Sequence, residues 1–551
     1  MGEGNRGKGE PGRAGPVGLC RPPSPAPVHS PLTKKAAGLV VLRLGSNMLP
    51  PRPAEADEPA VAALLDELPF AGLILFNGRW PETRDTLARL QAHSEAGLLV
   101  TTDMERGLGQ QVAGATVFPH LMAYGEAGDL DAVRAFAAAG AREALACGVH
   151  VALAPVADVN RNPRNPIIAT RAFGADPQHV ARMVGAYVEG ARAEGLLTTA
   201  KHFPGHGGTH QDSHAELPLV ADDRAVWEEQ DRPPFDAAVR AGAELVMTAH
   251  LAYPALDHLG LPATRSRPIL TDVLRGEMGF TGAVVTDSLH MAGIEDAARS
   301  EADVAVEVVA AGADLLLDAK DPVAVAEGLA RAVMEERLSE ARLDEALARV
   351  EALREGLRAR FGPDVFRTPP HPVVTVATPE HQALADNAAT AAIEILEGPL
   401  PDLGDGAGTL VVLVKPSPRP GEPEEMPLGE AVRRYLPRAS YRELEPADES
   451  EDAPFDALMV EAREAERLVV AMVVKPAAWR AFGLAARERR VVESLVAMRP
   501  TVLAALGSPR GLEGYTGAVA TLCAYSDVPA SQWAVAAALG GAGMGEREGG
   551  G

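Results

Sequence analysis

The amino-acid sequence predicts a (β/α)8 TIM-type barrel followed by a smaller α/β three-layer sandwich domain. From about residue 37, apolar runs of strand length alternate with Ala-, Glu- and Arg-rich stretches of helical pattern. Eight such units extend over roughly 330 residues, and polar residues follow most of the strands, as they do at the active-site end of a barrel. The predicted strands are Gly38–Arg43, Gly72–Phe76, Gly97–Thr102, His150–Pro155, Leu196–Lys201, Glu244–Ala249, Gly282–Thr286 and Ala313–Leu317.

Helices are predicted between these strands, most clearly over Asp129–Cys147, Pro177–Glu194 and Arg224–Ala241. The competing fold is a doubly wound open sheet, which needs a glycine-rich phosphate-binding turn after its first strand. The segment Gly38–Ser46 contains no GxGxxG pattern. The barrel is therefore favoured over the open sheet.

Prolines mark the division of the chain into domains. The helical pattern of Asp321–Arg360 ends the barrel, and residues 366–372 then form a predicted linker, because prolines stop helices and stiffen the chain. The expected organisation is a disordered extension (1–35), the barrel (36–365), the linker (366–372), the α/β sandwich (373–540) and a disordered glycine-rich tail (541–551). The second domain has predicted strands at Thr409–Val414, Leu468–Val474, Thr501–Leu506 and Ala518–Ala524 and a helix at Ala485–Met498.

The composition narrows the classes of function. Lys and Arg number 52 against 76 Asp and Glu, and the net charge of −24 argues against nucleic acid or an anionic membrane as a partner. The cysteines Cys20, Cys147 and Cys523 lie far apart and offer neither a disulfide framework nor a metal-ligand spacing. No run of about 18 apolar residues and no secretion signal is found, so a cytoplasmic protein is expected. The oligomeric state stays open.

Charged, imidazole and amide side chains follow six successive strands. Because the C-terminal ends of barrel strands meet around one pocket, this set predicts a site for a polar ligand or a reaction. Asp287 directly follows the apolar seventh strand, and its two candidate roles are a reactive carboxylate and the N-cap of the next turn. The strand-end residues are Asn77, Asp103, Glu105, Asp158, Arg171, Lys201, His202, His250 and Asp287.

The fifth strand leads into the loop Lys201–Pro218, which reads KHFPGHGGTHQDSHAELP. A carboxylate beside an imidazole fixes its tautomer and raises its basicity, so Asp212 and His214 are a candidate acid/base pair. The histidines of this loop together with Asp212 are also an alternative set of metal ligands. However, its proline and glycines predict an irregular loop, whereas the histidine ligands of a zinc hydrolase lie four residues apart on one face of a helix. Neither a metal nor an organic cofactor is expected.

The loop closely resembles the signature loop of glycoside hydrolase family 3 β-N-acetylhexosaminidases. The resemblance extends in order to Asp158–Pro177, Met247–Pro254 and Thr286–Gly293. It implies a retaining mechanism through a covalent glycosyl-enzyme. Retaining glycosidases generally use a pair of carboxyl groups for this mechanism. The implied roles are nucleophile for Asp287, general acid/base for His214, dyad partner for Asp212, sugar binding for Asp103, Arg171, Lys201 and His202, and a place near the sugar subsite for His250.

Two stretches depart from the family pattern. Family members usually carry D-x-E-G-G-R-V-x-R after the third strand, where this chain reads DMERGLGQQ over Asp103–Gln111. The downstream arginines are absent, so contacts beyond the first sugar are not implied. The usual G-H-G-D-T reads GHGGT over Gly205–Thr209 and lacks its carboxylate.

The expected function is an exo-β-N-acetylglucosaminidase that acts on muropeptides or chitin-type oligosaccharides, with a small carbohydrate as its partner. Two alternatives stay open. A phosphorylase of the same family is one, because a histidine acid/base does not repel incoming phosphate as a carboxylate would. A catalytically silent sugar-binding protein is the other.

Overall fold

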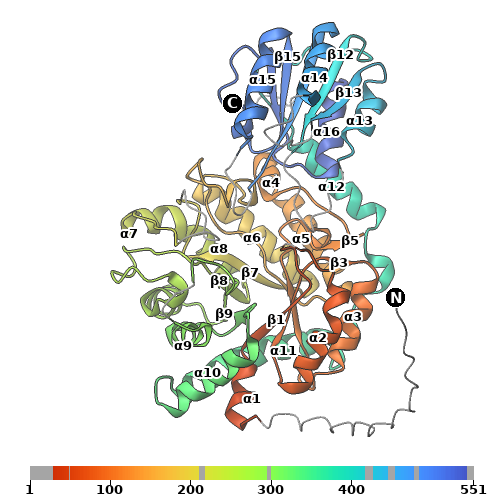
Figure 1. The fold of residues 1–551 in the computed structure, drawn as a ribbon. Coiled ribbons are helices and arrows are strands. Elements are labelled where there is room, and N and C mark those ends of the chain that lie inside the picture. Colours follow the sequence, from red (N-terminus) through yellow and green to blue (C-terminus); the bar gives the residue numbers. More distant parts are fainter. Residues whose placement is uncertain are drawn as a thin grey trace, which may run out of the picture.

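The computed structural model describes residues 29–48, 50–209, 217–294, 299–415, 426–444, 453–476 and 483–542. Within these ranges the chain forms a barrel surrounded by helices and a smaller C-terminal domain stacked on it, with α4 and α12 between the two (Figure 1). None of the helices in the described ranges is long and apolar enough to cross a membrane.

The barrel sheet has eight parallel strands in the order β10-β1-β2-β4-β6-β7-β8-β9. Its two ends are joined by a parallel bridge between Val285 and Leu315, and the N–H of Leu315 donates to the carbonyl of Val284 at 3.0 Å, so the sheet closes. The predicted fold class and all eight predicted strands are confirmed. The strands are β1 Val40–Leu44, β2 Gly72–Leu75, β4 Leu99–Thr102, β6 Val151–Ala152, β7 Leu197–Phe203, β8 Leu245–Thr248, β9 Ala283–Thr286 and β10 Leu316–Leu317, with a separate pair β3 Gly78–Arg79 and β5 Val112–Ala113.

Local capping signals set the ends of the barrel helices. Asp129 caps α5 by accepting two backbone N–H groups of its first turn, and α5 ends at Gly148, whose φ of 95° favours glycine. The helices are α1 Pro31–Ala37, α2 Ala54–Glu67, α3 Glu82–Gln91, α4 Leu121–Ala127, α5 Leu130–Cys147, α6 Pro177–Glu194, α7 Arg224–Val226, α8 Arg232–Ala241, α9 Glu301–Ala311, α10 Pro322–Met334 and α11 Glu340–Phe361, with π-helical segments at Trp227–Asp231 and Pro268–Glu277.

Three predicted segments differ in detail from the structure. The extension predicted to end at residue 35 overlaps α1, which Ser30 caps by accepting the N–H of Thr33; residues 1–28 lie outside the described ranges. The predicted helix Arg224–Ala241 contains a π-helical turn before α8, whose early prolines have no N–H to donate to the preceding turn. The predicted helix Asp321–Arg360 is two helices, because Ser339 caps a new one, α11.

The C-terminal domain contains a six-stranded sheet in the order β11-β16-β15-β14-β12-β13, in which β11 is antiparallel to β16. The four predicted strands are confirmed, whereas the edge strands β11 and β13 carry mostly exposed side chains and no long apolar run. Val411 and Val412 of β12 pack into separate clusters on opposite faces of the sheet, as a three-layer sandwich requires. The elements are β11 Glu394–Glu397, β12 Thr409–Val414, β13 Ser440–Leu444, β14 Arg467–Val474, β15 Thr501–Gly507, β16 Ala520–Cys523, α12 Pro379–Ala391, α13 Leu428–Tyr435, α14 Ala453–Glu464, α15 Ala486–Met498 and α16 Pro529–Leu539.

Buried polar groups fasten the C-terminal domain to the barrel. Glu143 of α5 accepts hydrogen bonds from the Thr116 hydroxyl at 2.6 Å, from the Ala377 N–H at 2.9 Å and from Nδ1 of His381 at 2.8 Å. His120, which precedes α4, lies with Nδ1 2.9 Å from the Ser526 hydroxyl. These contacts tie α12 and the segment after β16 to the barrel.

The ion cluster at the start of β10 is expected to stabilise the closed barrel. Asp314 is fully buried and lies 2.6 Å from Arg275, 2.7 Å from Arg342 and 3.1 Å from Arg349. We expect Asp314→Asn to lower the free energy of unfolding by about 3–5 kcal/mol, because three guanidinium groups lose the buried carboxylate that they share. Urea unfolding followed by circular dichroism measures this change.

The control is Glu335→Gln, which breaks an exposed pair with Arg337 and should change stability by less than about 1 kcal/mol. Equal losses in the two variants would contradict the prediction.

Candidate active site at the barrel mouth

A buried lysine lies at the centre of the barrel mouth. Nζ of Lys201, on β7, donates to Oδ1 of Asp103 at 2.6 Å and lies 2.9 Å from Oε1 of Glu105. Burial works to lower the pKa of this ammonium, but Asp103 and Glu105 outweigh it and raise the pKa. Lys201 therefore keeps its positive charge although only 2% of its side chain is exposed.

Glu105 holds a second cation in place. Arg171 donates to it through Nε at 2.9 Å and through Nη2 at 2.7 Å, which is a two-point contact that fixes the plane of the guanidinium. Burial works to raise the pKa of Glu105, but the charges of Arg171 and Lys201 hold it well below its usual range. Glu105 is thus an ionised carboxylate that positions two cations.

Asp158 is a buried carboxylate that holds two histidines, one at the end of β7 and one in the loop that follows it. Its Oδ2 accepts from Nδ1 of His202 at 2.6 Å, and its Oδ1 accepts from the N–H of His206 at 2.6 Å. Burial works to raise the pKa of Asp158, but His202 and His206 outweigh it and lower the pKa. Nε2 of His202 lies 3.3 Å from Nη2 of Arg171, so this ring donates at Nδ1 and accepts at Nε2. One imidazole tautomer is selected.

Asp287 lies directly after β9, and its surroundings differ from those of the lysine. Its Oδ1 accepts the N–H of Ser288 at 2.7 Å. His250, which follows β8, has Nε2 3.1 Å from the carbonyl oxygen of Ser288, to which it donates, and Nδ1 2.8 Å from the Thr264 hydroxyl. His250 therefore holds the backbone one residue past Asp287.

The structure joins Asp103, Arg171, Lys201 and His202 into one hydrogen-bonded network through Glu105 and Asp158. Asp287 and His250 form a second group around Ser288. The predicted pair Asp212 and His214 lies in residues 210–216, outside the described ranges. Among the described residues, no group of three or more His, Cys, Asp or Glu side chains is arranged to hold a metal ion.

Four charged residues at the barrel mouth have no role assigned from sequence. Glu105 and Asp158 carry the strand-end signal, but the sequence does not distinguish them from sugar ligands. Arg43 of β1 and Asp318 after β10 form an ion pair, with Arg43 Nε 2.6 Å from Oδ1 of Asp318. The same strand-end rule, applied to the last strand, would have found Asp318, whereas Arg43 lies within β1.

Two cavities flank the barrel. One, of about 390 Å³, lies between the domains, where Asn160, Pro163 and Ala169 of the loop after β6 face Arg510 and Glu513 of the C-terminal domain. It borders the loop that carries Asp158 and Arg171.

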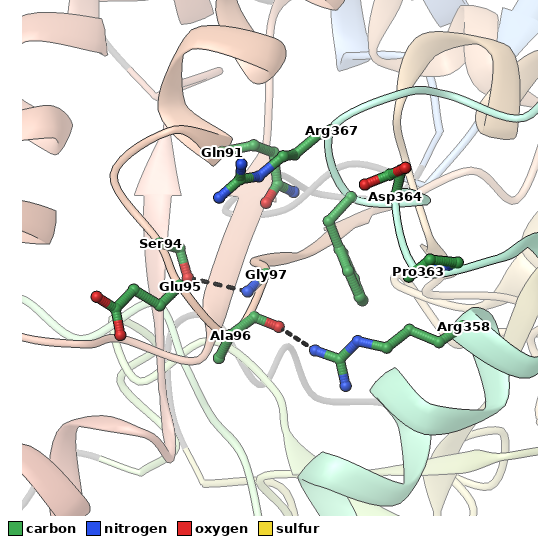
Figure 2. Close-up of a pocket in the computed structure, with 10 residues that line it drawn as sticks. Gln91, Ser94, Glu95, Ala96, Gly97, Arg358, Pro363, Asp364 and Arg367 are labelled. Carbon is green, nitrogen blue, oxygen red and sulfur yellow. Dashed lines mark hydrogen bonds between the residues drawn. The ribbon is translucent and has the colours of Figure 1, made fainter.

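The other cavity, of about 190 Å³, lies at the opposite end of the barrel, where Gly97 precedes β4. Figure 2 shows Arg358 donating to the carbonyl of Ala96, at 2.5 Å, on one side of this cavity. The same guanidinium pairs with Glu351 at 2.6 Å and lies over the Phe366 ring. Arg358 therefore fastens α11 to the N-terminal end of the barrel.

Fold and site together define a (β/α)8 barrel protein with a cluster of charged side chains at the C-terminal ends of its strands. The family model described as the glycosyl hydrolase family 3 N terminal domain matches residues 32–353, more than half of the chain. The chain belongs to glycosyl hydrolase family 3, as the resemblance of its loop and strand-end motifs predicted.

Relatives and a solved structure agree with this family. Beta-hexosaminidase A of Pseudoalteromonas piscicida is 33% identical over 369 residues, which cover 61% of this chain and 60% of that protein. A beta-N-acetylglucosaminidase/beta-glucosidase of Cellulomonas fimi is 33% identical over 352 residues, 62% of each chain. The chain thus spans about three fifths of these two proteins. A family 3 beta-N-acetylglucosaminidase structure from Paenibacillus sp. str. FPU-7 has a TM-score of 0.79 at 27% identity and covers 93% of this chain and 97% of that one.

Two buried histidines should make the fold acid-sensitive. Burial lowers the pKa of His206, and likewise that of His150, from the ordinary 6.5 to about 4. The unfolded chain therefore binds more protons, and stability is lost as the pH falls from about 6.5 towards 4. Between pH 7 and pH 5 the protonation of each histidine should lower the free energy of unfolding by about 2 kcal/mol. Urea unfolding at the two pH values measures the loss.

His150→Gln removes one of these groups at the start of the β6 segment, where Nδ1 accepts the N–H of Val100 at 3.2 Å. Its stability should fall less between pH 7 and pH 5 than that of the wild type. An unchanged pH dependence would show that His150 is not one of the titrating groups.

Proposed function

We propose that the chain is a retaining exo-β-N-acetylglucosaminidase that removes terminal N-acetylglucosamine from muropeptides or chitin-type oligosaccharides. The observation that carries the proposal is an ionised network around Lys201 at the mouth of a family 3 barrel, with Asp287 at the end of a further strand of the same barrel. Relatives named beta-hexosaminidase and beta-N-acetylglucosaminidase support the choice of sugar.

In this proposal Asp287 attacks the anomeric carbon while His214 gives a proton to the departing glycosidic oxygen. A covalent glycosyl-enzyme and a free alcohol result. Water then gives a proton to His214 and attacks the same carbon, which releases the sugar with its β configuration and restores the Asp287 carboxylate. Asp212 accepts from the other imidazole nitrogen and orients the ring. The N–H of Ser288 supports the role of Asp287, because it donates to the carboxylate and orients it.

The network around Lys201 binds the sugar in the same proposal. Asp103 has 29% of its side chain exposed and Arg171 has 23%, whereas Lys201 has 2%. This difference in exposure supports direct contacts of sugar hydroxyls with Asp103 and Arg171. The more deeply buried Lys201 and His202 hold those two side chains in place. Ionised groups bound to hydroxyls orient the sugar and discriminate the transition state from the ground state.

The loop after β4 supports recognition of a single terminal sugar. Where the family pattern has arginines, this chain has Leu108, which is buried, and Gln111, which accepts from the Asn47 amide at 2.7 Å. These side chains stabilise the loop itself. We therefore expect specificity to rest on the terminal sugar more than on the rest of the chain.

Covalent trapping tests the nucleophile. A fluorinated N-acetylglucosaminide whose enzyme adduct hydrolyses slowly should label the peptide that contains Asp287, because the carboxylate bonds to the anomeric carbon. Mass spectrometry of the digested protein locates the label. Asp287→Ala should lose the label and nearly all turnover, and Asp272→Ala, a surface carboxylate, should retain both. A label on any other residue would overturn the mechanism.

The acid/base role of His214 is tested with a series of leaving groups. His214→Gln should reduce kcat/KM roughly 10²- to 10⁴-fold for glycosides with poor leaving groups, and far less for highly activated aryl glycosides that need no proton. His93→Gln, at an exposed histidine paired with Asp66, is the matched control. A loss that is independent of the leaving group would contradict the role.

Product analysis in phosphate buffer decides between hydrolysis and phosphorolysis. The proposal expects free N-acetylglucosamine, and accumulation of the sugar 1-phosphate would establish a phosphorylase instead. Binding of N-acetylglucosamine without any turnover of a chromogenic glycoside would establish a silent sugar-binding protein.

A further inference from the structure

Three adjacent strands meet at the seam where the barrel closes, and each contributes a polar group at its C-terminal end. Arg43 comes from β1, Asp318 follows β10, and Ser288 follows β9. Arg43 contacts both carboxylate oxygens of Asp318, with Nε at 2.6 Å from Oδ1. The hydroxyl of Ser288 donates to Oδ2 of the same carboxylate at 2.6 Å. We call these three residues the seam clamp.

Asp318 is held tightly in an unusual conformation. Its side chain is fully buried, its N–H donates to the carbonyl of Val41 at 3.0 Å, and its φ is +64°. Left-handed backbone is disfavoured for residues other than glycine, asparagine and aspartate, and it is concentrated at functional sites. Nε2 of His290 lies 3.7 Å from Oδ1 of Asp318.

The guanidinium of Arg43 contacts Asp318 and further groups around β1. Besides Asp318, its guanidinium lies 3.4 Å from the Ser46 hydroxyl, 3.2 Å from the Met48 sulfur and 5.3 Å from the centre of the Phe76 ring. The Asp318 carboxylate, paired with this guanidinium, accepts from the Ser288 hydroxyl.

Ser288 transmits this constraint to Asp287. Its hydroxyl is fixed by Asp318, its carbonyl accepts from Nε2 of His250 at 3.1 Å, and its N–H donates to Oδ1 of Asp287 at 2.7 Å. The hydroxyl and the carbonyl hold Ser288 through its side chain and through the peptide group that follows it, and they therefore restrict the backbone rotation that directs its N–H towards Asp287.

We propose that Arg43, Asp318 and Ser288 are positioning residues that orient the Asp287 carboxylate for attack on the anomeric carbon. The inference rests on the proposed function and deepens it, because Arg43 and Asp318 lie outside the motifs that carry the family resemblance. Displacing a reacting group by about 1 Å can cost roughly 100-fold in rate. The clamp should therefore affect the chemical step more than sugar binding.

The test compares variants that separate positioning from stability. Ser288→Ala removes the hydroxyl and leaves the ion pair intact. Asp318→Asn removes the charge and tolerates the positive φ. The matched control is Asp314→Asn, which neutralises an equally buried carboxylate near the opposite end of β10, far from Asp287. Arg43→Lys, which keeps the charge, should retain more activity than Arg43→Met.

We expect kcat and the rate constant of covalent labelling to fall roughly 10- to 100-fold in Ser288→Ala and Asp318→Asn, with KM changed by less than about threefold. Asp314→Asn should be less stable yet keep kcat per folded molecule. If Asp318→Asn does not fold, Ser288→Ala decides alone. A wild-type kcat in Ser288→Ala, or an equal loss in Asp314→Asn, overturns the clamp and leaves the proposed function standing. A wild type that turns over no glycoside overturns both.

Discussion

A buried ammonium must have its counter-charges within contact distance, and this requirement organises the barrel mouth. Taking the charge of Lys201 out of water costs several kcal/mol unless carboxylates offset it. Asp103 and Glu105 do so, and Glu105 in turn requires Arg171. Arg171 lies against the accepting nitrogen of His202, whose other nitrogen is fixed by Asp158. The position of each charged side chain thus depends on its neighbour, and a substitution at one of them would disturb the whole network.

Barrel closure supplies the geometry in which these pairs form. Parallel strands in a closed sheet direct all their C-terminal ends to one side. The residues at the C-terminal ends of β4, β6 and β7 therefore meet, although Asp103 and Lys201 are almost a hundred positions apart in the chain. The ends of β9, β10 and β1 meet in the same way at the seam. The mouth consequently has two ion-paired groups, one around Lys201 and the other around Asp318.

The eight strands, the two domains and most strand-end residues could be predicted because apolar periodicity and strand-end position are local signals. Edge strands β11 and β13 could not, since their exposed side chains lack an apolar run. The roles of Glu105 and Asp158 were equally hidden, because a carboxylate that binds a sugar and one that holds an arginine look alike in sequence. The pairing of Arg43 with Asp318 depends on which strands close the barrel, and only the three-dimensional structure shows it.

The C-terminal domain contributes rigidity to the loops that carry the paired charges. Arg510 donates to the carbonyl of Pro163 in the loop between Asp158 and Arg171. The segment after β5 is held by the contact of His120 with Ser526. Loops are the mobile parts of a barrel, and a site of fixed geometry needs support from outside its first contacts. The second domain supplies this support without placing any of its own described side chains in the network around Lys201, so the two domains share the task of holding one site.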